Sequence, residues 1–198
     1  MTAERTGPPK YYVLESYGKN HKGEDNRMLL GSLRETPGGE GWLTGHKFKT
    51  PPKEPVVVNI KVGFERGDLL PSWGTPPVMS GEFYKALCDA GVDNLDVYDA
   101  VLRSKDGTVE YKGLKAVNIL GLVRAADLSK TTFNEPSSRL IDASIDSLEI
   151  DPNKAMGFLI FRLAEYVSAV IVHERVKKFI EPMNFPYVQF NEPSSFTS

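Results

Sequence analysis

Apolar residues recur along this chain mostly in short runs of strand length. The runs are rich in β-branched and aromatic residues and are separated by turn-forming sequences, which favours strands over helices. Another run, at residues 139–150, alternates imperfectly, as is typical of an edge or exposed strand. We expect the other strands at residues 10–16, 53–62, 95–104, 114–125, 157–164, 168–173 and 185–190.

Residues 81–90 have the clearest helix signals. Ser80 is a good N-cap, and Gly91 stands where a helix commonly ends in a glycine with positive φ. Phe83 with Leu87, and Tyr84 with Cys88, are pairs four residues apart and predict one apolar helix face. We therefore expect Cys88 to be a buried core residue rather than a reactive nucleophile.

Three further local signals predict short elements. An Asp-Pro pair at residues 151–152 predicts the N-cap and first position of a short helix that runs through Met156. Residues 173–182 predict a helix that ends at a proline. Asp106 and Gly107 lie between two strand patterns and predict a hairpin turn.

Glycine and proline divide the chain into two compositional parts. Residues 1–79 hold 11 Gly and 9 Pro, whereas residues 80–198 hold 6 Gly and 5 Pro. We expect a loop-rich N-terminal β region over 1–79 and an α+β core region over 80–198, both in one compact unit. The fold class that follows is α+β, with a mainly antiparallel sheet and a few short helices.

The expected strand at 157–164 has a definite orientation. Phe161 and Leu163 alternate with Arg162, so the two apolar side chains are predicted to face one side of the sheet and Arg162 the other. The apolar stretch 155–172 also contains Glu165. Because each charge is costly inside a bilayer, this stretch favours two buried strands over a membrane span.

Net charge and cysteine content limit the kinds of partner and the cellular compartment that we expect for this protein. Lys and Arg number 24 against 26 Asp and Glu, which gives a net charge of −2 and a pI near 6.0. Nucleic-acid binding needs an excess of clustered positive charge, so we expect no DNA or RNA partner. The single cysteine excludes an intrachain disulfide, and the N-terminus has no apolar run of signal-peptide length, so we expect a cytoplasmic protein.

No motif in the sequence predicts a catalytic, cofactor-binding or metal site. His21, His46 and His173 do not have the spacing of metal ligands. The glycines at 38–41 have no phosphate-loop Gly-Lys-Ser/Thr beside them. One enzyme alternative stays open, in which the strand register brings Arg162, Glu165 and His173 into one polar pocket.

Acidic residues are distributed unevenly along the chain. Residues 82–151 contain eight Lys and Arg against thirteen Asp and Glu, a net charge of −5, and the stretches 89–99 and 140–153 contain no basic residue. Such stretches form a solvated face, a docking surface for a basic partner, or a catalytic pair of acids. The candidate docking residues are Asp93, Asp96, Asp99, Asp142, Asp146 and Glu149.

A six-residue segment occurs twice. Phe-Asn-Glu-Pro-Ser-Ser stands at residues 133–138 and again at 190–195, with unrelated flanks. Six residues are too few for a structural repeat, so we interpret the two copies as similar polar loops.

A series of motifs follows one another over residues 64–190, namely 80–87, Asp106-Gly107 before Tyr111, 117–119, Phe161-Arg162-Leu163, Ile171-Val172 before the helix of 176–180, and 188–190. Their order resembles a large bacterial immunity protein family of polymorphic toxin systems, formerly a domain of unknown function and α+β in its predicted fold. A glycine-rich turn is expected before the last strand of that family, and residues 181–186 depart from it.

The resemblance implies an immunity protein that binds and neutralises one cognate bacterial toxin inside the cell, with no catalysis of its own. Members of the family neutralise toxins of different activities, so the resemblance implies a protein partner without naming it. The alternatives are the small enzyme described above and an adaptor encoded beside secretion genes. The sequence leaves the oligomeric state open.

Overall fold

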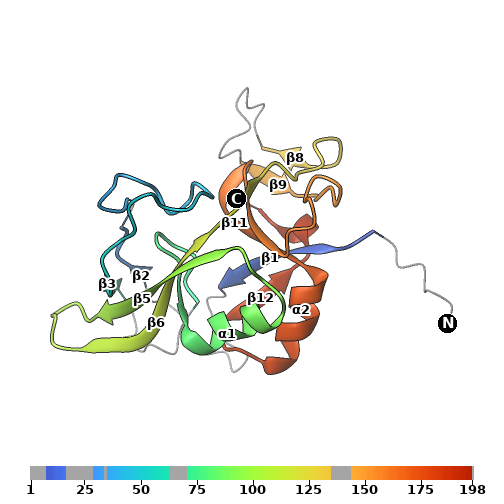
Figure 1. The fold of residues 1–198 in the computed structure, drawn as a ribbon. Helices are drawn as coiled ribbons and strands as arrows, with labels where there is room; N and C mark the ends of the chain where they lie inside the picture. Colours follow the sequence, from blue (N-terminus) through green and yellow to red (C-terminus); the bar gives the residue numbers. More distant parts are fainter. Residues whose placement is uncertain (1–7, 17–28, 34, 63–70, 135–143, 198) are drawn as a thin grey trace.

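The computed structural model describes residues 8–16, 29–33, 35–62, 71–134 and 144–197 (Figure 1). Within these residues the fold is α+β, with strands in far greater number than helices, as the sequence predicts. The strands are β1 (Tyr11–Ser16), β2 (Leu29–Leu30), β3 (Val56–Val62), β4 (Val78–Ser80), β5 (Leu95–Arg103), β6 (Glu110–Ile119), β7 (Leu122–Val123), β8 (Thr132–Phe133), β9 (Ile145–Ser147), β10 (Ile160–Leu163), β11 (Tyr166–His173) and β12 (Val188–Asn191). The helices are α1 (Gly81–Asp89), α2 (Glu174–Ile180) and the short 3-10 helices η1 (Glu181–Met183) and η2 (Pro193–Ser195).

The first sheet has the strand order β12-β1-β11-β10-β7. Its pairs are antiparallel except for the parallel pair of β10 and β7. β1 comes from the loop-rich N-terminal part and lies between two strands of the C-terminal part, with Val13 opposite both Ile171 and Asn191. The beginning and the end of the chain therefore build one sheet together.

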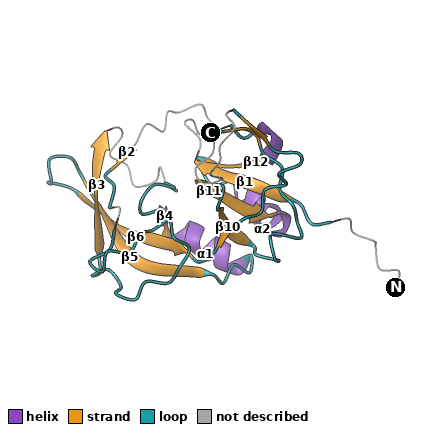
Figure 2. Cartoon of the chain, turned by 90° about the horizontal axis from the view of Figure 1, so that it is seen from above, coloured by secondary structure: helices purple, strands orange, loops and turns teal. Residues whose placement is uncertain are grey.

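The second sheet has the order β2-β3-β5-β6-β4 and includes one parallel pair, β3 with β5. β5 and β6 form the predicted hairpin. At its turn Gly107 has a φ of 75°, and the Asp106 carboxylate accepts hydrogen bonds from Ser104 Oγ (2.6 Å) and from the Thr108 amide (3.0 Å). Figure 2 shows the two sheets side by side, with α1 near their junction and α2 beside the first sheet.

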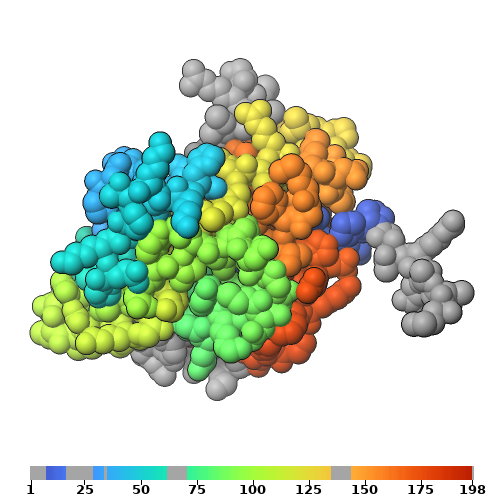
Figure 3. Space-filling view, in the orientation of Figure 1, coloured from blue at the N-terminus to red at the C-terminus, as the bar shows by residue number. Residues whose placement is uncertain are grey.

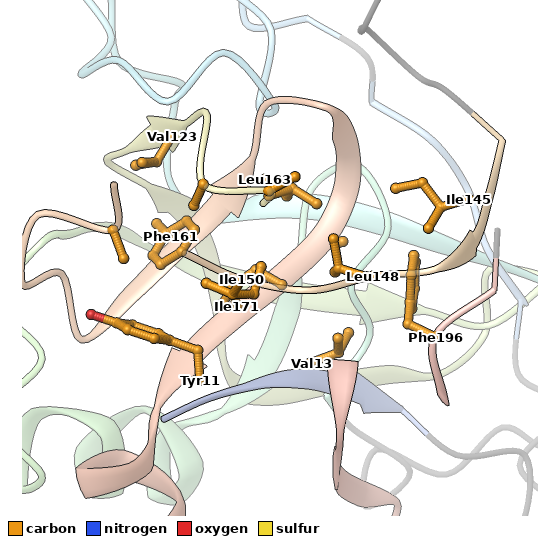
Figure 4. Close-up of a cluster of buried hydrophobic side chains, with 14 residues drawn as sticks. Tyr11, Val13, Val123, Ile145, Leu148, Ile150, Phe161, Leu163, Ile171 and Phe196 are labelled. Carbon is orange, nitrogen blue, oxygen red and sulfur yellow. The ribbon is translucent and has the colours of Figure 1, made fainter. Parts of the chain in front are cut away.

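One face of the first sheet packs under the segment that contains β9 (Figure 4). From the sheet, Phe161, Leu163 and Ile171 are each 0% exposed, and Ile145 and Leu148 from the covering segment are equally buried. Phe161 and Leu163 thus share a face, as the alternation predicts. Tyr11 closes one end of this cluster, with its ring edge-on to Phe161 at 5.8 Å.

The opposite face of the first sheet packs against both helices and the second sheet. Val170 and Val172 of β11 meet Phe83 and Leu87 of α1 in this cluster, and Val176 of α2 joins them. The far face of the second sheet is covered by the segment of residues 36–50, which contributes the buried side chains of Trp42 and Phe48. In Figure 3 the blue and cyan surface of residues 35–62 lies beside the yellow surface of residues 120–134.

α1 has the predicted ends, and Phe83 and Leu87 of the predicted apolar face are buried, but Cys88 is not. Ser80 Oγ accepts a hydrogen bond from the Phe83 amide at 3.1 Å, and Gly91 follows the helix with a φ of 98°. Cys88, expected in the core, is exposed. The buried positions are Phe83, Ala86, Leu87 and Ala90. Consecutive helix residues are about 100° apart around the axis, so Cys88, which follows Leu87, points away from this buried face.

The short helix predicted from residue 151 through Met156 is wrong. Asp151 does cap a turn, since its Oδ1 accepts from the Asn153 amide at 3.0 Å and its carbonyl from the Lys154 amide at 3.1 Å. The turn goes no further because Met156 and Gly157 both have positive φ, at 51° and 76°. Left-handed residues end a right-handed helix.

The run predicted at 114–125 is divided at Gly121 into the end of β6 and β7, which belong to different sheets, and the other strand predictions agree with the structure to within a few residues at their ends. The helix predicted at 173–182 is α2 followed by η1. The imperfect strand at 139–150 is represented by β9, which pairs with β8 in a two-stranded sheet, and the beginning of that stretch lies outside the described residues. The first copy of the repeated segment also lies largely outside them, whereas the second forms the end of β12 and η2.

Candidate functional site

An acidic cleft of about 720 Å³ opens where four distant segments meet. The segments are the entry to β1, the chain after β7, the chain after β9, and the chain from β12 into η2. Four acidic residues line the cleft against two lysines, which leaves a net negative wall. These six residues are Asp127, Glu149, Asp151 and Glu192 with Lys10 and Lys130.

Backbone hydrogen bonds hold the two inner segments of the cleft together. The Asp127 amide donates to the Glu149 carbonyl at 2.8 Å, and the Asp151 amide donates to the Ala125 carbonyl at 2.8 Å. Between these bonds Ala126 and Ile150 form an isolated antiparallel bridge. The acidic side chains therefore project from a paired backbone, which fixes their positions relative to one another.

Asp127 and Lys130 form the most strongly tied pair in the cleft. The Asp127 carboxylate accepts from Ser129 Oγ at 2.6 Å and meets Lys130 Nζ at 3.1 Å. The Ser129 and Lys130 hydrogen bonds lower the pKa of Asp127 to about 2. The carboxylate is therefore ionised throughout the physiological pH range.

Glu149 and Glu192 differ from Asp127 in their partners. No described cation forms an ion pair with either carboxylate. Glu149 is half-buried and held through its backbone, whose amide donates to Thr131 Oγ1 at 3.1 Å, and Glu192 is exposed. These two carboxylates are the ones that a cationic ligand in the cleft can pair with.

Apolar and aromatic surface lies beside these charges. Tyr11 lines the cleft, is 4% exposed, and its buried hydroxyl has no hydrogen-bond partner among the described residues. In Figure 4 this hydroxyl points away from the hydrophobic cluster. Prolines 8, 9, 152 and 193 complete the wall. A long basic side chain fits such a site, because its aliphatic stem packs on apolar surface while its charged end reaches carboxylates.

The predicted docking residues of the first acidic stretch do not form one surface. Asp96 and Asp99 stand on β5 three residues apart and therefore face opposite sides of the second sheet. Asp96 accepts from Tyr98 Oη at 2.6 Å, and Asp99 pairs with Lys115 Nζ at 2.6 Å. Asp93 is exposed in the turn before β5.

The second acidic stretch is divided as well. Glu149 lies in the cleft, whereas Asp146 is exposed on β9 and is not part of its lining. Asp142 lies outside the described residues. Of the six predicted docking residues, the structure places Glu149 in the cleft.

Arg162, Glu165 and His173, which the enzyme alternative groups in one pocket, point to three different places. Arg162 Nη1 donates to the Val167 carbonyl at 2.8 Å. Glu165 is 3% exposed, and burial raises its pKa. His173 stands at the far end of β11 from Glu165, roughly 26 Å along the strand at about 3.3 Å per residue.

His173 stabilises the junction between β11 and α2. Its Nδ1 accepts from the Arg175 amide at 3.0 Å and so caps α2, and its ring meets Tyr11 edge-on at 5.2 Å. Burial lowers its pKa. The strand register therefore separates the three residues instead of joining them.

Sequence reasoning missed three of the four acidic residues that line the cleft. Asp151 stood in the second acidic stretch and was interpreted as a helix cap. Glu192 belongs to the second copy of the repeated segment, and the proline and serine after it also line the cleft. That repeat was the one available signal for Glu192, whereas nothing in the local sequence marks Asp127.

No family model matches this chain, and no curated protein matches it. Among the described residues no group of three or more His, Cys, Asp or Glu is placed to hold a metal ion. None of the helices in the described part of the chain has the length and apolar character needed to cross a membrane.

Proposed function

We propose that this protein is an immunity protein that neutralises a cognate bacterial toxin by binding it at the acidic cleft. The observation that supports this most is the cleft itself, whose lining includes two acidic residues, Glu149 and Glu192, that form no ion pair with a described cation. The resemblance of residues 64–190 to immunity proteins supports the class of partner. The partner's contribution is a basic segment, whose Lys or Arg enters the cleft.

Charge at the cleft acts mainly on encounter and orientation. Complementary potentials steer two proteins together and exclude wrong partners, while the pairs formed add less to affinity. An ion pair in a partly enclosed cleft is also screened less by salt than one on an open surface. The cleft thus gives a protein of small net charge a local preference for a basic partner.

Co-expression tests the proposal in cells. The proposal predicts that the gene immediately upstream encodes a toxin domain, which is expressed with this protein while growth is measured. We expect wild type to restore growth, and Glu149→Lys with Glu192→Lys to restore it poorly. A matched control, Glu82→Lys with Asp93→Lys, makes the same change in net charge at exposed positions outside the cleft lining and should restore growth.

Growth that wild type does not restore would contradict the proposal, and so would a complex that forms while the toxin stays active. The second result is the one expected of an adaptor. Equal rescue by the cleft variant and the control would contradict the assignment of the cleft as the docking site.

Association kinetics give a second readout with the same proteins. The association rate of wild type should fall as ionic strength rises, because charges more than about 8 Å apart are screened at physiological salt. The cleft variant should associate more slowly at low salt and depend less on salt. A wild-type rate that does not change with salt would mean that apolar contacts alone guide docking.

A further inference from the structure

β12 (Val188–Asn191) is an end strand of the first sheet and the longest of the four strands that end the two large sheets. β7 and β2 have two residues each, and β4 has three. The outer side of β4 is also occupied, because Val78 forms an antiparallel bridge with Ser72. Among the described residues no strand pairs with the outer side of β12, which lies beside β1 in Figure 2.

The backbone of β12 has hydrogen-bonding groups that β1 does not use. The pairing of the two strands is antiparallel, from Ser16 opposite Val188 to Val13 opposite Asn191. In such a ladder alternate residues direct both their N–H and C=O groups to the same side, so two of the four residues direct theirs away from β1. In the described part of the chain no other backbone hydrogen bond involves residues 188–191.

β12 lacks features that commonly keep an edge strand from pairing with another chain. Edge strands of monomeric proteins often carry a charged side chain or a proline, or contain a β-bulge. The four residues of β12 are Val-Gln-Phe-Asn, and their register with β1 has no bulge. The strand is therefore open to one further strand.

A hollow of about 290 Å³ lies beside β12 and is lined by all four of its residues. Its opposite wall comes from the end of α2 and from the chain around η1, and includes the half-buried Phe185. Phe179 and Met183, which are neighbours in sequence of wall residues, are 40% and 45% exposed. A strand added to β12 would therefore meet apolar side chains as well as backbone groups.

The lining of this hollow and the lining of the acidic cleft are consecutive in sequence. Asn191 lines the hollow, and Glu192 lines the cleft. The backbone of Glu192 is still extended, with a φ of −61° and a ψ of 136°. Residues directly opposite one another in an antiparallel pair have Cβ atoms about 4.5–5.5 Å apart. A Lys or Arg opposite Glu192 would therefore lie close enough to pair with its carboxylate.

Charge distinguishes two candidate occupants of β12. A second copy of this chain would bring its own residues 185–194, which contain no Lys or Arg, and would leave Glu192 without a cation. A basic strand from another protein would pair with the backbone of β12 and with Glu192 at the same time. The charge therefore favours a basic partner over a second copy.

We propose that β12 accepts an extended segment of the toxin as an additional antiparallel strand of the first sheet, with a Lys or Arg of that segment opposite Glu192. The identity of the partner rests on the proposed function, whereas the strand site rests on the geometry of β12. In strand addition the backbone hydrogen bonds provide affinity, and alternate side chains provide specificity. Here the basic residue adds the specificity of the acidic cleft.

Short peptides test the strand site without the toxin. The probe is acetyl-Lys-Thr-Val-Thr-Val-Thr-amide, whose lysine lies opposite Glu192 when its valines lie opposite Phe190 and Val188. We expect saturable shifts of the amide signals of residues 188–191 in NMR spectra of the ¹⁵N-labelled protein, and none in the β5–β6 hairpin. The same peptide with Glu in place of Lys should bind about fivefold more weakly or less, because it places like charges opposite each other.

Two N-methylated forms of the probe test strand pairing itself. One is methylated at the amides of its second and fourth residues, and the other at those of its third and fifth, so that each loses N–H groups on one side of the strand. Only one side of the peptide faces β12. One form should therefore lose binding while the other keeps it, and equal affinities of the two forms would overturn strand pairing.

Two variants of the protein locate the charge. Glu192→Gln should reduce the preference for the Lys peptide over the Glu peptide to about twofold or less, because the opposing carboxylate is gone. Glu82→Gln makes the same change at an exposed position of α1 that lines neither the hollow nor the cleft, and should keep the wild-type preference. An unchanged preference in Glu192→Gln would overturn the pairing with Glu192.

The outcomes separate this inference from the proposed function. No saturable shift at residues 188–191 with any of the peptides would overturn the strand site, even if the protein neutralises the toxin. Peptide binding by a protein that does not restore growth in co-expression would support the strand site and contradict the proposed function. A dimer in sedimentation equilibrium that the Lys peptide dissociates would show that a second copy occupies β12, and would overturn the toxin as its occupant.

Discussion

Phe161 and Arg162 are neighbours in β10 whose side chains lie on opposite faces of the first sheet. Phe161 is fully buried between the rings of Tyr11 and Phe158, whereas Arg162 is equally buried without a counter-charge. Alternation in the sequence was enough to predict which way each residue faces. It could not predict that both faces are buried, because that depends on what packs against the sheet from elsewhere in the chain.

The substitution Phe161→Ala tests the packing of that cluster. Removing a fully buried phenylalanine should lower the free energy of unfolding by about 3–5 kcal/mol, since it removes apolar contacts and leaves a cavity. Urea unfolding of wild type and variant measures the difference. An unchanged unfolding midpoint would show that Phe161 is not packed as described.

Glu165 predicts a pH dependence of stability. Burial raises its pKa above the ordinary 4.5, while hydrogen bonds from the backbone amides of Glu165 and Ala126, and the charges of Lys154 and Arg124, oppose the shift. A carboxyl that holds its proton more tightly when folded contributes stability below its unfolded pKa, and that contribution is lost as pH rises through the folded pKa. The buried Oε2 has no hydrogen-bond donor, so the ionised form is costly at neutral pH.

The variant Glu165→Gln should therefore be more stable than wild type at pH 7, by about 1–3 kcal/mol, the usual cost of an unsatisfied buried group. The difference should shrink as pH falls toward 4.5. Urea unfolding at a series of pH values measures it. A variant that is less stable than wild type at pH 7 would show that the ionised Glu165 is stabilised by a partner.

At the scale of elements, local sequence predicted α1 and the β5–β6 hairpin because their ends are set by residues within a few positions. Ser80 and Gly91 define the helix, and Asp106 with Gly107 defines the turn. The same reasoning failed after Asp151, where the cap is present but left-handed residues end the turn. Nothing in the sequence marks Met156 for a positive φ.

Gly91, at the end of α1, is a position where a side chain is unfavourable. Its φ of 98° is unfavourable for a side chain, and a Cβ there would lie 3.1 Å from Arg175 Nη2. Gly91→Ala should lower the free energy of unfolding by about 1–2 kcal/mol, the cost of a left-handed residue with a Cβ. Thermal unfolding in comparison with Gly74→Ala measures this.

The control variant, Gly74→Ala, is expected to have little effect on stability. Gly74 has no positive φ, and a Cβ there meets Ser72 Oγ at an ordinary 3.7 Å, so its substitution should change stability by less than about 0.5 kcal/mol. Equal effects of the two substitutions would contradict the strained geometry at Gly91.

At the scale of the whole molecule, the acidic cleft exists because segments far apart in sequence meet. β1 lies between β11 and β12, and this pairing brings the entry to β1 beside the end of β12. Periodicity identifies each strand but says nothing of its partner 150 or more residues away, so the fold class was predictable and the cleft was not. Glu149 was found as one of a run of acids, whereas Glu192 needed the strand order.

The most direct test of neutralisation is a titration of the toxin domain's activity with increasing amounts of this protein. If the protein acts by binding alone, activity falls linearly and reaches zero at one equivalent, and toxin separated from the complex and refolded is active again. Complete loss of activity at a small fraction of one equivalent, with the toxin chemically altered, would mean catalytic turnover and would contradict the account.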